Sequence, residues 1–230
     1  MKCYCYETDL SFIFCVEDVE SAQLESMIRY KGWKEIDGKF LMPYPQHMFT
    51  SPRDKELMND NFARFGQAMF KSGLFGFDWK KPLELLSQKF KENEIEWYIV
   101  GSVSDTVRGV DVIPGDIDIV IHTRDYDKVK NICYSHYSDS IMSPFTDNRG
   151  LFPLQFIGRL FLAGALFEIA ADENWNMENR KPTYEMVSWN GFDLYVEALQ
   201  LRYDIERGRK REDRIKAIEV YMNHNKLRTK

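Results

Sequence analysis

The order of apolar and polar positions in the first 45 residues predicts a small β-α-β-β module. An apolar run at 12–16 is typical of a short buried strand. Apolar positions at helical spacing follow it, and Gly32 stands where a glycine ends a helix. Asp37 and Gly38 form the kind of dipeptide that tight hairpin turns favour, so we expect a short strand on either side of them.

A connection and a long helix are predicted between this module and the rest of the chain. Residues 43–50 contain two prolines, and residues 51–71 then show apolar positions at helical spacing. Residues 72–82 hold two glycines and a proline, which favours a boundary between two parts of the chain. The sequence therefore predicts an N-terminal α+β module at 1–75 and a second domain at 82–225.

Beyond residue 82 helices and strands alternate regularly. A helix is expected at 82–93, with Leu85, Leu86 and Phe90 directed inward. Further helices are predicted at 102–109, 125–137, 197–206 and 211–222, strands at 94–100, 116–121 and 162–170, and a hairpin at 185–196. This order predicts an α+β fold with α/β-like alternation: a mixed sheet flanked by helices, beside the small N-terminal module.

The run GDIDIVI, at 115–121, has the pattern of a buried strand except for Asp116 and Asp118. Side chains alternate along a strand, so both aspartates point to one face and the isoleucines point to the other. A bare buried carboxylate is costly unless it is paired or bound to a metal. Two carboxylates at the start of a strand suit Mg²⁺, which prefers carboxylate, water and phosphate oxygens. The alternative is an edge strand whose polar face lies in water.

Gly101 and Ser102 end one predicted strand and begin a predicted helix. A glycine there lets a phosphate group approach the backbone, and the first amides of the helix point at the anion. The hydroxyl of Ser102 can add a donor. A Gly-Ser pair after a strand is common by itself, but its distance from the Asp-x-Asp strand indicates a combined phosphate and metal site.

Residues 97–121, WYIVGSVSDTVRGVDVIPGDIDIVI, resemble the signature of the nucleotidyltransferase-fold superfamily. That signature is an apolar strand, Gly-Gly or Gly-Ser, a short helix and an Asp-x-Asp strand. The resemblance is to the branch that holds the small antibiotic nucleotidyltransferases and the AbiEii-type toxins, which often have an Arg-Gly pair where this chain has Arg108 and Gly109. It covers about 82–221 and leaves out the first 75 or so residues.

The resemblance implies that Asp116 and Asp118 hold Mg²⁺ in a two-metal site. A third carboxylate from a later strand is expected to complete the site and to act as base toward the acceptor hydroxyl. Glu168 is the candidate and Asp172 the reserve. Many relatives have aspartate at this position, so Glu168 is a departure. The alternative is a paired or solvent-facing glutamate.

A nucleoside triphosphate such as ATP is the implied donor substrate. The residues implied to contact it are Gly101, Ser102, Arg108, and one of Lys210 or Arg211. The basic motif of the branch has an ambiguous register at 209–213, and a solvated helix surface is the alternative for that stretch. Residues 113–115 also depart from the branch, which often has arginine or histidine just before Asp-x-Asp.

Composition limits the partners. The 230 residues are 44% apolar and 29% charged, with a formal net charge of -5. This is ordinary globular composition without a broad cationic field, so general binding to nucleic acid or to an anionic membrane is not expected. No run is long enough to span a membrane and the N-terminus has no apolar signal core, so we expect a cytoplasmic protein.

Two functions of different classes follow. The first is an enzyme that transfers a nucleoside monophosphate from a nucleoside triphosphate to an acceptor hydroxyl by metal-ion catalysis. The acceptor stays open among a small molecule, a tRNA end and a protein hydroxyl. The second is a non-catalytic nucleotide-sensing or partner-binding module on the same fold, as in a toxin-antitoxin or regulatory pair. The distance of Glu168 or Asp172 from Asp116 and Asp118 discriminates between them.

Overall fold

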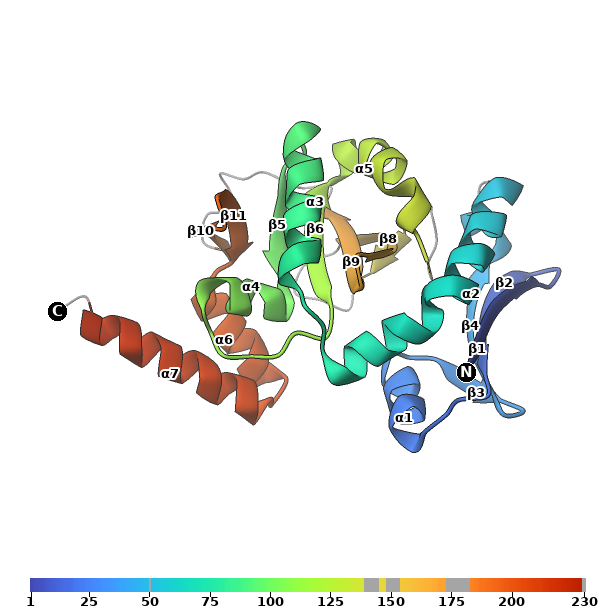
Figure 1. Ribbon diagram of the computed structural model, residues 1–230, viewed down its shortest axis with the longest axis horizontal. Helices are drawn as coiled ribbons and strands as arrows, with labels where there is room; N and C mark the ends of the chain where they lie inside the picture. The colour runs from blue at the N-terminus through green and yellow to red at the C-terminus, as the bar shows by residue number, and fades with distance from the viewer. Residues whose placement is uncertain (50, 139–144, 148–153, 173–182, 229–230) are drawn as a thin grey trace.

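The protein has an α+β fold, as predicted. The computed structural model describes residues 1–49, 51–138, 145–147, 154–172 and 183–228. The described strands form two sheets, which lie at opposite sides of the view in Figure 1 with a long helix running between them. No helix in the described part of the chain is both long and apolar enough to cross a membrane.

The N-terminal sheet is antiparallel, with the order β1-β2-β4-β3. Its elements are β1 (Lys2–Glu7), β2 (Ser11–Glu17), α1 (Ala22–Tyr30), β3 (Lys34–Ile36) and β4 (Lys39–Pro45). The predicted β-α-β-β order is confirmed, with β1 in addition. Asp37 and Gly38 both have positive φ, as the tight turn between β3 and β4 requires.

Helix α2 (Pro52–Phe75) packs on β1 and reaches the larger sheet (Figure 1). A β-carbon on Gly66 would lie 2.7 Å from Cys3 Sγ, so this glycine lets helix and strand approach closely. At the other side of the helix, Asn61 Nδ2 donates to the carbonyl oxygens of Ser135 and Tyr137. The helix runs four residues past its predicted end. The division into 1–75 and 82–225 stays a prediction.

The larger described sheet is mixed and seven-stranded, with the order β10-β11-β5-β6-β9-β8-β7. Its strands are β5 (Trp97–Val100), β6 (Ile117–His122), β7 (Phe145–Asp147), β8 (Leu154–Leu162), β9 (Ala165–Asp172), β10 (Tyr184–Trp189) and β11 (Phe192–Glu197). The α-helices of this part are α3 (Lys80–Glu92), α4 (Gly101–Arg108), α5 (Tyr126–Cys133), α6 (Leu199–Gly208) and α7 (Glu212–Arg228). Short 3₁₀ turns are η1 (Gln46–Met48), η2 (Thr123–Asp125) and η3 (Tyr134–His136).

Two details of the prediction are wrong. Leu85 is 42% exposed, because the buried stripe of α3 follows Leu83, Leu86 and Phe90 instead. The strand predicted at 162–170 is in fact the end of β8, a turn and most of β9. Ala163 and Gly164 both have positive φ and form that turn.

Packing in the core determines which face of β6 is directed toward the helices. Ile117, Ile119 and Ile121 are buried in the same apolar cluster as Leu86 of α3 and Val129 of α5. Because side chains alternate along a strand, the aspartates of β6 are held on the opposite face. The alternation predicted for this strand is confirmed.

Candidate functional site

The register of β6 and β9 brings three predicted carboxylates together. The two strands are parallel neighbours, and Asp118 stands opposite Glu168. Asp116 precedes β6 on the same face. One ligand oxygen from each of Asp116, Asp118 and Glu168 lies within 4.8 Å of the others. We call these three residues the acidic cluster. Asp172 is buried at the far end of β9, opposite His122, and is outside the cluster.

Gly101 allows the acidic cluster to fit beside α4. Val100, the last residue of β5, is the register partner of Asp118, so the chain turns into α4 directly beside that carboxylate. A β-carbon on Gly101 would lie 2.5 Å from Asp118 Oδ2, and its φ is +69°. Both the space and the backbone conformation therefore require glycine. Gly109, also at positive φ, ends the helix.

A cavity of about 480 Å³ opens beside the cluster. Gly101, Asp118 and Glu168 line it, together with Arg209. Its apolar lining comes from Val100, Ile119, Val120, Leu154, Phe156, Ile169, Ala170 and Ile205. An apolar cavity of this size with a few convergent charged groups is typical of a small-molecule site.

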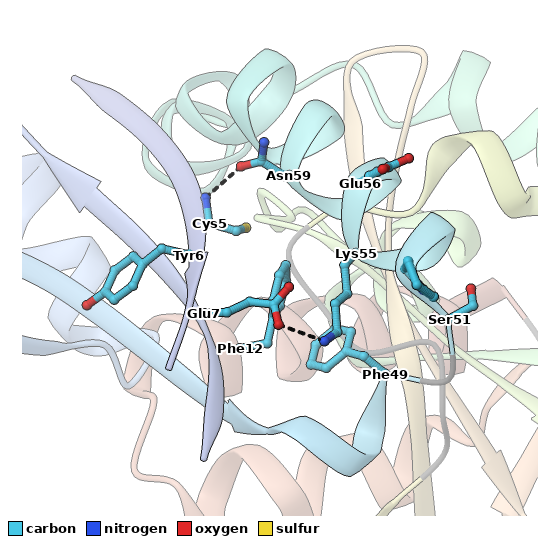
Figure 2. Close-up of a pocket in the computed structure, with 10 residues that line it drawn as sticks. Cys5, Tyr6, Glu7, Phe12, Phe49, Ser51, Lys55, Glu56 and Asn59 are labelled. Carbon is cyan, nitrogen blue, oxygen red and sulfur yellow. Dashed lines mark hydrogen bonds and ion pairs between the residues drawn. The ribbon is translucent and has the colours of Figure 1, made fainter. Parts of the chain in front are cut away.

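A second hollow, of about 630 Å³, lies in the N-terminal part between β1 and α2. Figure 2 shows two interactions within it: Lys55 is paired with Glu7 at 2.8 Å, and the backbone amide of Cys5 donates to Asn59. It lies apart from the three carboxylates, so the smaller cavity is the candidate active site.

Two cations contact the acidic cluster, and neither was predicted from the sequence. Lys31, the residue that follows α1, places its Nζ 2.5 Å from Asp116 Oδ2 and 3.7 Å from Glu168 Oε1. Arg159 of β8 stands opposite Glu168 in the sheet, and its Nε donates to Glu168 Oε1 at 2.8 Å. Asp118 makes no ion pair among the described residues.

The pKa values of Glu168 and Asp118 are shifted in opposite directions. Burial opposes ionisation of Glu168, but the charges of Arg159 and Lys31 outweigh it and lower the pKa of Glu168 to about 2. Burial, followed by the charges of Asp116 and Glu168, raises the pKa of Asp118 well above its usual range. Glu168 is therefore a fixed anion, and Asp118 is the carboxylate that most needs a further cation.

A buried ionic network holds the opposite wall of the cavity. Arg202 of α6 donates to Asp105 of α4 through two nitrogens, pairs with Glu206 one turn later in α6, and lies 3.5 Å from Glu197 at the end of β11. We call Arg202, Asp105, Glu197 and Glu206 the arginine cluster. Glu197 also accepts from the amide of Gly101 at 3.2 Å. The arginine cluster thus fixes the N-terminal end of α4 beside the acidic cluster.

Only some of the residues predicted to contact phosphate line the cavity. Gly101 lines the cavity, whereas Ser102 is buried in the first turn of α4 and is not part of the lining. The Arg108 side chain is 4% exposed and engaged: its Nη2 contacts Glu185 at 2.9 Å and donates to the Glu197 carbonyl.

The C-terminal basic stretch reaches the cavity through a different residue from those predicted. Lys210 is exposed at positive φ and is not part of the lining, and Arg211 points to Glu206 at 3.5 Å. Arg209, one position earlier, lines the cavity. A phosphate contact from this stretch stays a prediction.

The donor set fits a divalent cation. It consists of carboxylate oxygens alone, which are the ligands that Mg²⁺ prefers, and it opens to a cavity that can supply water and phosphate oxygens. Asp118, with its raised pKa and no cation partner among the described side chains, is the ligand that such an ion would neutralise.

No protein-family model and no curated protein matches the sequence significantly. Among solved structures, the chain is similar to a candidate nucleotidyltransferase from Thermotoga maritima (20% identity, 63% of this chain and 92% of that chain, TM-score 0.46). It is also similar to the lincosamide antibiotic adenylyltransferase LnuA with lincomycin bound (10% identity, 61% and 96%, TM-score 0.44). A third is ANT(2″)-Ia in complex with adenylyl-2″-tobramycin (9% identity, 63% and 88%, TM-score 0.38). At these identities and TM-scores we infer function from the cavity and its two ionic clusters.

Proposed function

We propose that the chain is a Mg²⁺-dependent nucleotidyltransferase that moves a nucleoside monophosphate from a nucleoside triphosphate to an acceptor hydroxyl. The observation that carries the proposal is the convergence of Asp116, Asp118 and Glu168 within 4.8 Å at the edge of a cavity, beside a glycine that opens α4. Glu168 meets the condition set from the sequence, because it lies within metal-sharing reach of both aspartates.

The three carboxylates of the acidic cluster have distinct roles in the proposed reaction. Asp116 and Asp118 would hold the metal, and bound Mg²⁺ would supply positive charge to the α-phosphate and the leaving group. Glu168 completes the anionic set. Its low pKa suits a ligand, whereas a general base works best with a pKa near the operating pH. In the transfer, the acceptor oxygen would bond to the α-phosphorus as the bond from phosphorus to the bridging oxygen breaks. The hydroxyl proton would pass to water, and pyrophosphate would leave.

The cavity supports a nucleotide as the donor. Its half-buried apolar residues, among them Leu154 and Phe156, offer a surface for the base. Arg209 brings a guanidinium to the same cavity and can pair with phosphate oxygens. Gly101 leaves room for the backbone to approach an anion, although its own amide already donates to Glu197.

The proposal is tested by calorimetric titration of ATP, GTP, CTP and UTP with Mg²⁺. We expect one of them to bind the wild type in a metal-dependent way and to lose that binding in Asp116→Ala/Asp118→Ala. The double variant Asp111→Ala/Asp127→Ala is the matched control, because it removes the same charge from exposed positions. Equal metal-dependent binding by wild type and Asp116→Ala/Asp118→Ala would contradict the proposal.

One observation favours the non-catalytic module as a second candidate. Lys31 already contacts both Asp116 and Glu168. Its ammonium therefore supplies positive charge where a metal ion would otherwise bind, which is expected of a site that no longer uses metal. Release of pyrophosphate in the presence of Mg²⁺ and a panel of small hydroxyl compounds, a tRNA and a protein acceptor separates the two. A net charge of -5 argues mildly against the tRNA.

A further inference from the structure

We propose that the Lys31 ammonium permanently occupies one of the two cation positions of the acidic cluster, so that the bound nucleotide is served by a single divalent ion. The inference rests on the proposed function. Two-metal sites for phosphoryl transfer place their ions about 3.5–4 Å apart between shared carboxylates. Here one such place, between Asp116 and Glu168, is filled by a side chain of the N-terminal part.

The contacts show which ligands are left. Lys31 Nζ contacts Oδ2 of Asp116 and Oε1 of Glu168, and Arg159 contacts the same Oε1. Asp118 lies in the cluster without an ion pair to either cation. A divalent ion thus has both oxygens of Asp118 and the second oxygen of Asp116 available, and phosphate oxygens and water can complete its coordination.

The charges around the acidic cluster also favour a single divalent ion. Lys31 and Arg159 offset two of the three carboxylate charges of the cluster. With one divalent ion bound, the net charge of the three carboxylates and their cations becomes positive, which attracts an incoming triphosphate. A second divalent ion between the same carboxylates would be repelled by both Lys31 and Arg159. Like charges at such distances repel strongly in a partly buried site.

Lys31 is held in place by the packing of α1 and α2. Its amide closes the last turn of α1 by donating to Met27, and the next residue, Gly32, turns the chain away at positive φ. Gly73 of α2 lies against Gly115, where an added β-carbon on either would come within 4.0 Å of the other's backbone. The N-terminal part is thereby fixed directly beside the residue that precedes Asp116.

Lys31 has little space to withdraw into the protein interior. The gap beside it, between α1, α2 and β8, has a volume of about 10 Å³ and is lined by Trp33, Phe70 and Arg159 among others. That is about the least volume that accepts one water molecule, and far too little for a hydrated ammonium. An ammonium that yielded its place to metal would have to move toward solvent, where 23% of the Lys31 side chain is exposed.

The test counts metal ions. Mn²⁺ replaces Mg²⁺, and bound Mn²⁺ per chain is measured by electron paramagnetic resonance in the presence of the α,β-methylene analogue of the nucleotide that binds. We expect one ion in the wild type and two in Lys31→Met, which keeps the apolar stem. Lys31→Arg keeps the charge and should bind one ion. Lys34→Met, at an exposed position on β3, is the matched control and should also bind one.

Each other result overturns the inference in a recognisable way. Two ions in both wild type and Lys31→Met would show that Lys31 yields its place to metal. One ion in both would show that it occupies no metal position. No ion in the wild type but two in Lys31→Met would make Lys31 a block rather than a substitute. Absence of metal-dependent nucleotide binding in the wild type and both Lys31 variants would remove the proposed function itself.

Discussion

The two ionic clusters on either side of Gly101 are built from the same kinds of residue but differ in balance and exposure. In the arginine cluster, Arg202 is 1% exposed, and Asp105 and Glu206 are fully buried. In the acidic cluster, Asp116 and Glu168 keep 20% and 26% of their side-chain surface open to solvent, and Lys31, which contacts both, keeps 23%.

Their hydrogen bonding differs as well. Every carboxylate of the arginine cluster contacts Arg202, whereas Asp118 in the acidic cluster contacts neither Lys31 nor Arg159. A closed and mutually paired group fixes elements in place. An open group with one uncompensated carboxylate keeps a place for something that the folded chain does not itself supply. The first cluster therefore has the properties of a structural ion-pair group, and the second has those that the proposed metal site needs.

Removal of Arg202 should have the largest effect on stability. Arg202→Met leaves Asp105, Glu197 and Glu206 without their shared cation in a buried position. Breaking one side of a buried ion pair typically costs about 3–5 kcal/mol. We expect a loss of that order in the free energy of unfolding, measured by urea denaturation with tryptophan fluorescence.

The matched control is Arg207→Met, on the exposed side of the same helix. Its free energy of unfolding should stay within about 0.5 kcal/mol of the wild type, as for most surface substitutions. If the two variants were equally stable, the arginine cluster would not have the structural role given to it here.

Gly101→Ala tests the point where the two clusters meet. The new β-carbon would collide with Asp118 Oδ2, and a residue other than glycine is strained at a φ of +69°. Strained backbone of this kind costs about 1–3 kcal/mol. We expect a loss in that range by urea denaturation, together with loss of Mn²⁺ binding.

Gly164→Ala separates the two causes of that loss. Its φ is +90°, but an added β-carbon there would meet no atom within 4 Å. Gly164→Ala should lose only the free energy of unfolding that the strained backbone costs, and it should keep its affinity for Mn²⁺. Equal metal binding by Gly101→Ala and Gly164→Ala would show that the contact with Asp118 does not matter to the site.

The parts of the site that lie within one stretch of sequence were predictable. Strand alternation placed Asp116 and Asp118 on one face, and the Gly-Ser pair marked the place where a strand ends and α4 begins. Glu168 was expected because the resemblance calls for a third carboxylate on a later apolar strand, and the register of β6 and β9 places it opposite Asp118. The turn at Ala163 was missed, since alanine seldom adopts positive φ and gives no turn signal.

The parts that depend on tertiary packing were not predictable. Lys31 is 85 residues from Asp116 in sequence and meets it only because α1 docks beside the larger sheet. Arg159 is found only once the β8–β9 register is known. Within the basic stretch, the resemblance implied a phosphate contact from Lys210 or Arg211, but the end of α6 decides that Arg209 lines the cavity instead.

Asp118→Asn should stabilise the metal-free protein. The pKa of Asp118 is raised in the folded state, so its contribution to stability is complete below the ordinary value of 3.8 and is lost as pH rises through the raised value. Removing the charge should recover part of that loss at neutral pH. Relief of an unfavourable group at a functional site commonly gains about 0.5–2 kcal/mol. The melting temperature, measured in EDTA from pH 4 to 8, should fall less with pH than in the wild type.

Asp116→Asn is the counterpart with the same change in charge. It removes the partner of Lys31, so it should destabilise the metal-free protein at neutral pH although it too lowers the negative charge of the cluster. Both variants should lose Mn²⁺ binding. A gain in stability from Asp116→Asn equal to that from Asp118→Asn would mean that the cluster suffers from general repulsion and not from one uncompensated carboxylate.

Arg209→Ala should have the smallest effect, and on binding alone. Arg209 is exposed at the end of α6 and belongs to neither ionic cluster, so its loss should leave the free energy of unfolding unchanged. An exposed charge pair contributes about 0.2–1 kcal/mol, so nucleotide affinity should fall by a small factor, measured by calorimetry. Lys210→Ala removes the same charge next to it, outside the cavity lining, and should leave affinity at the wild-type value. A larger loss in Lys210→Ala than in Arg209→Ala would restore the register first expected for the basic stretch, and would place the triphosphate outside the cavity that the two clusters enclose.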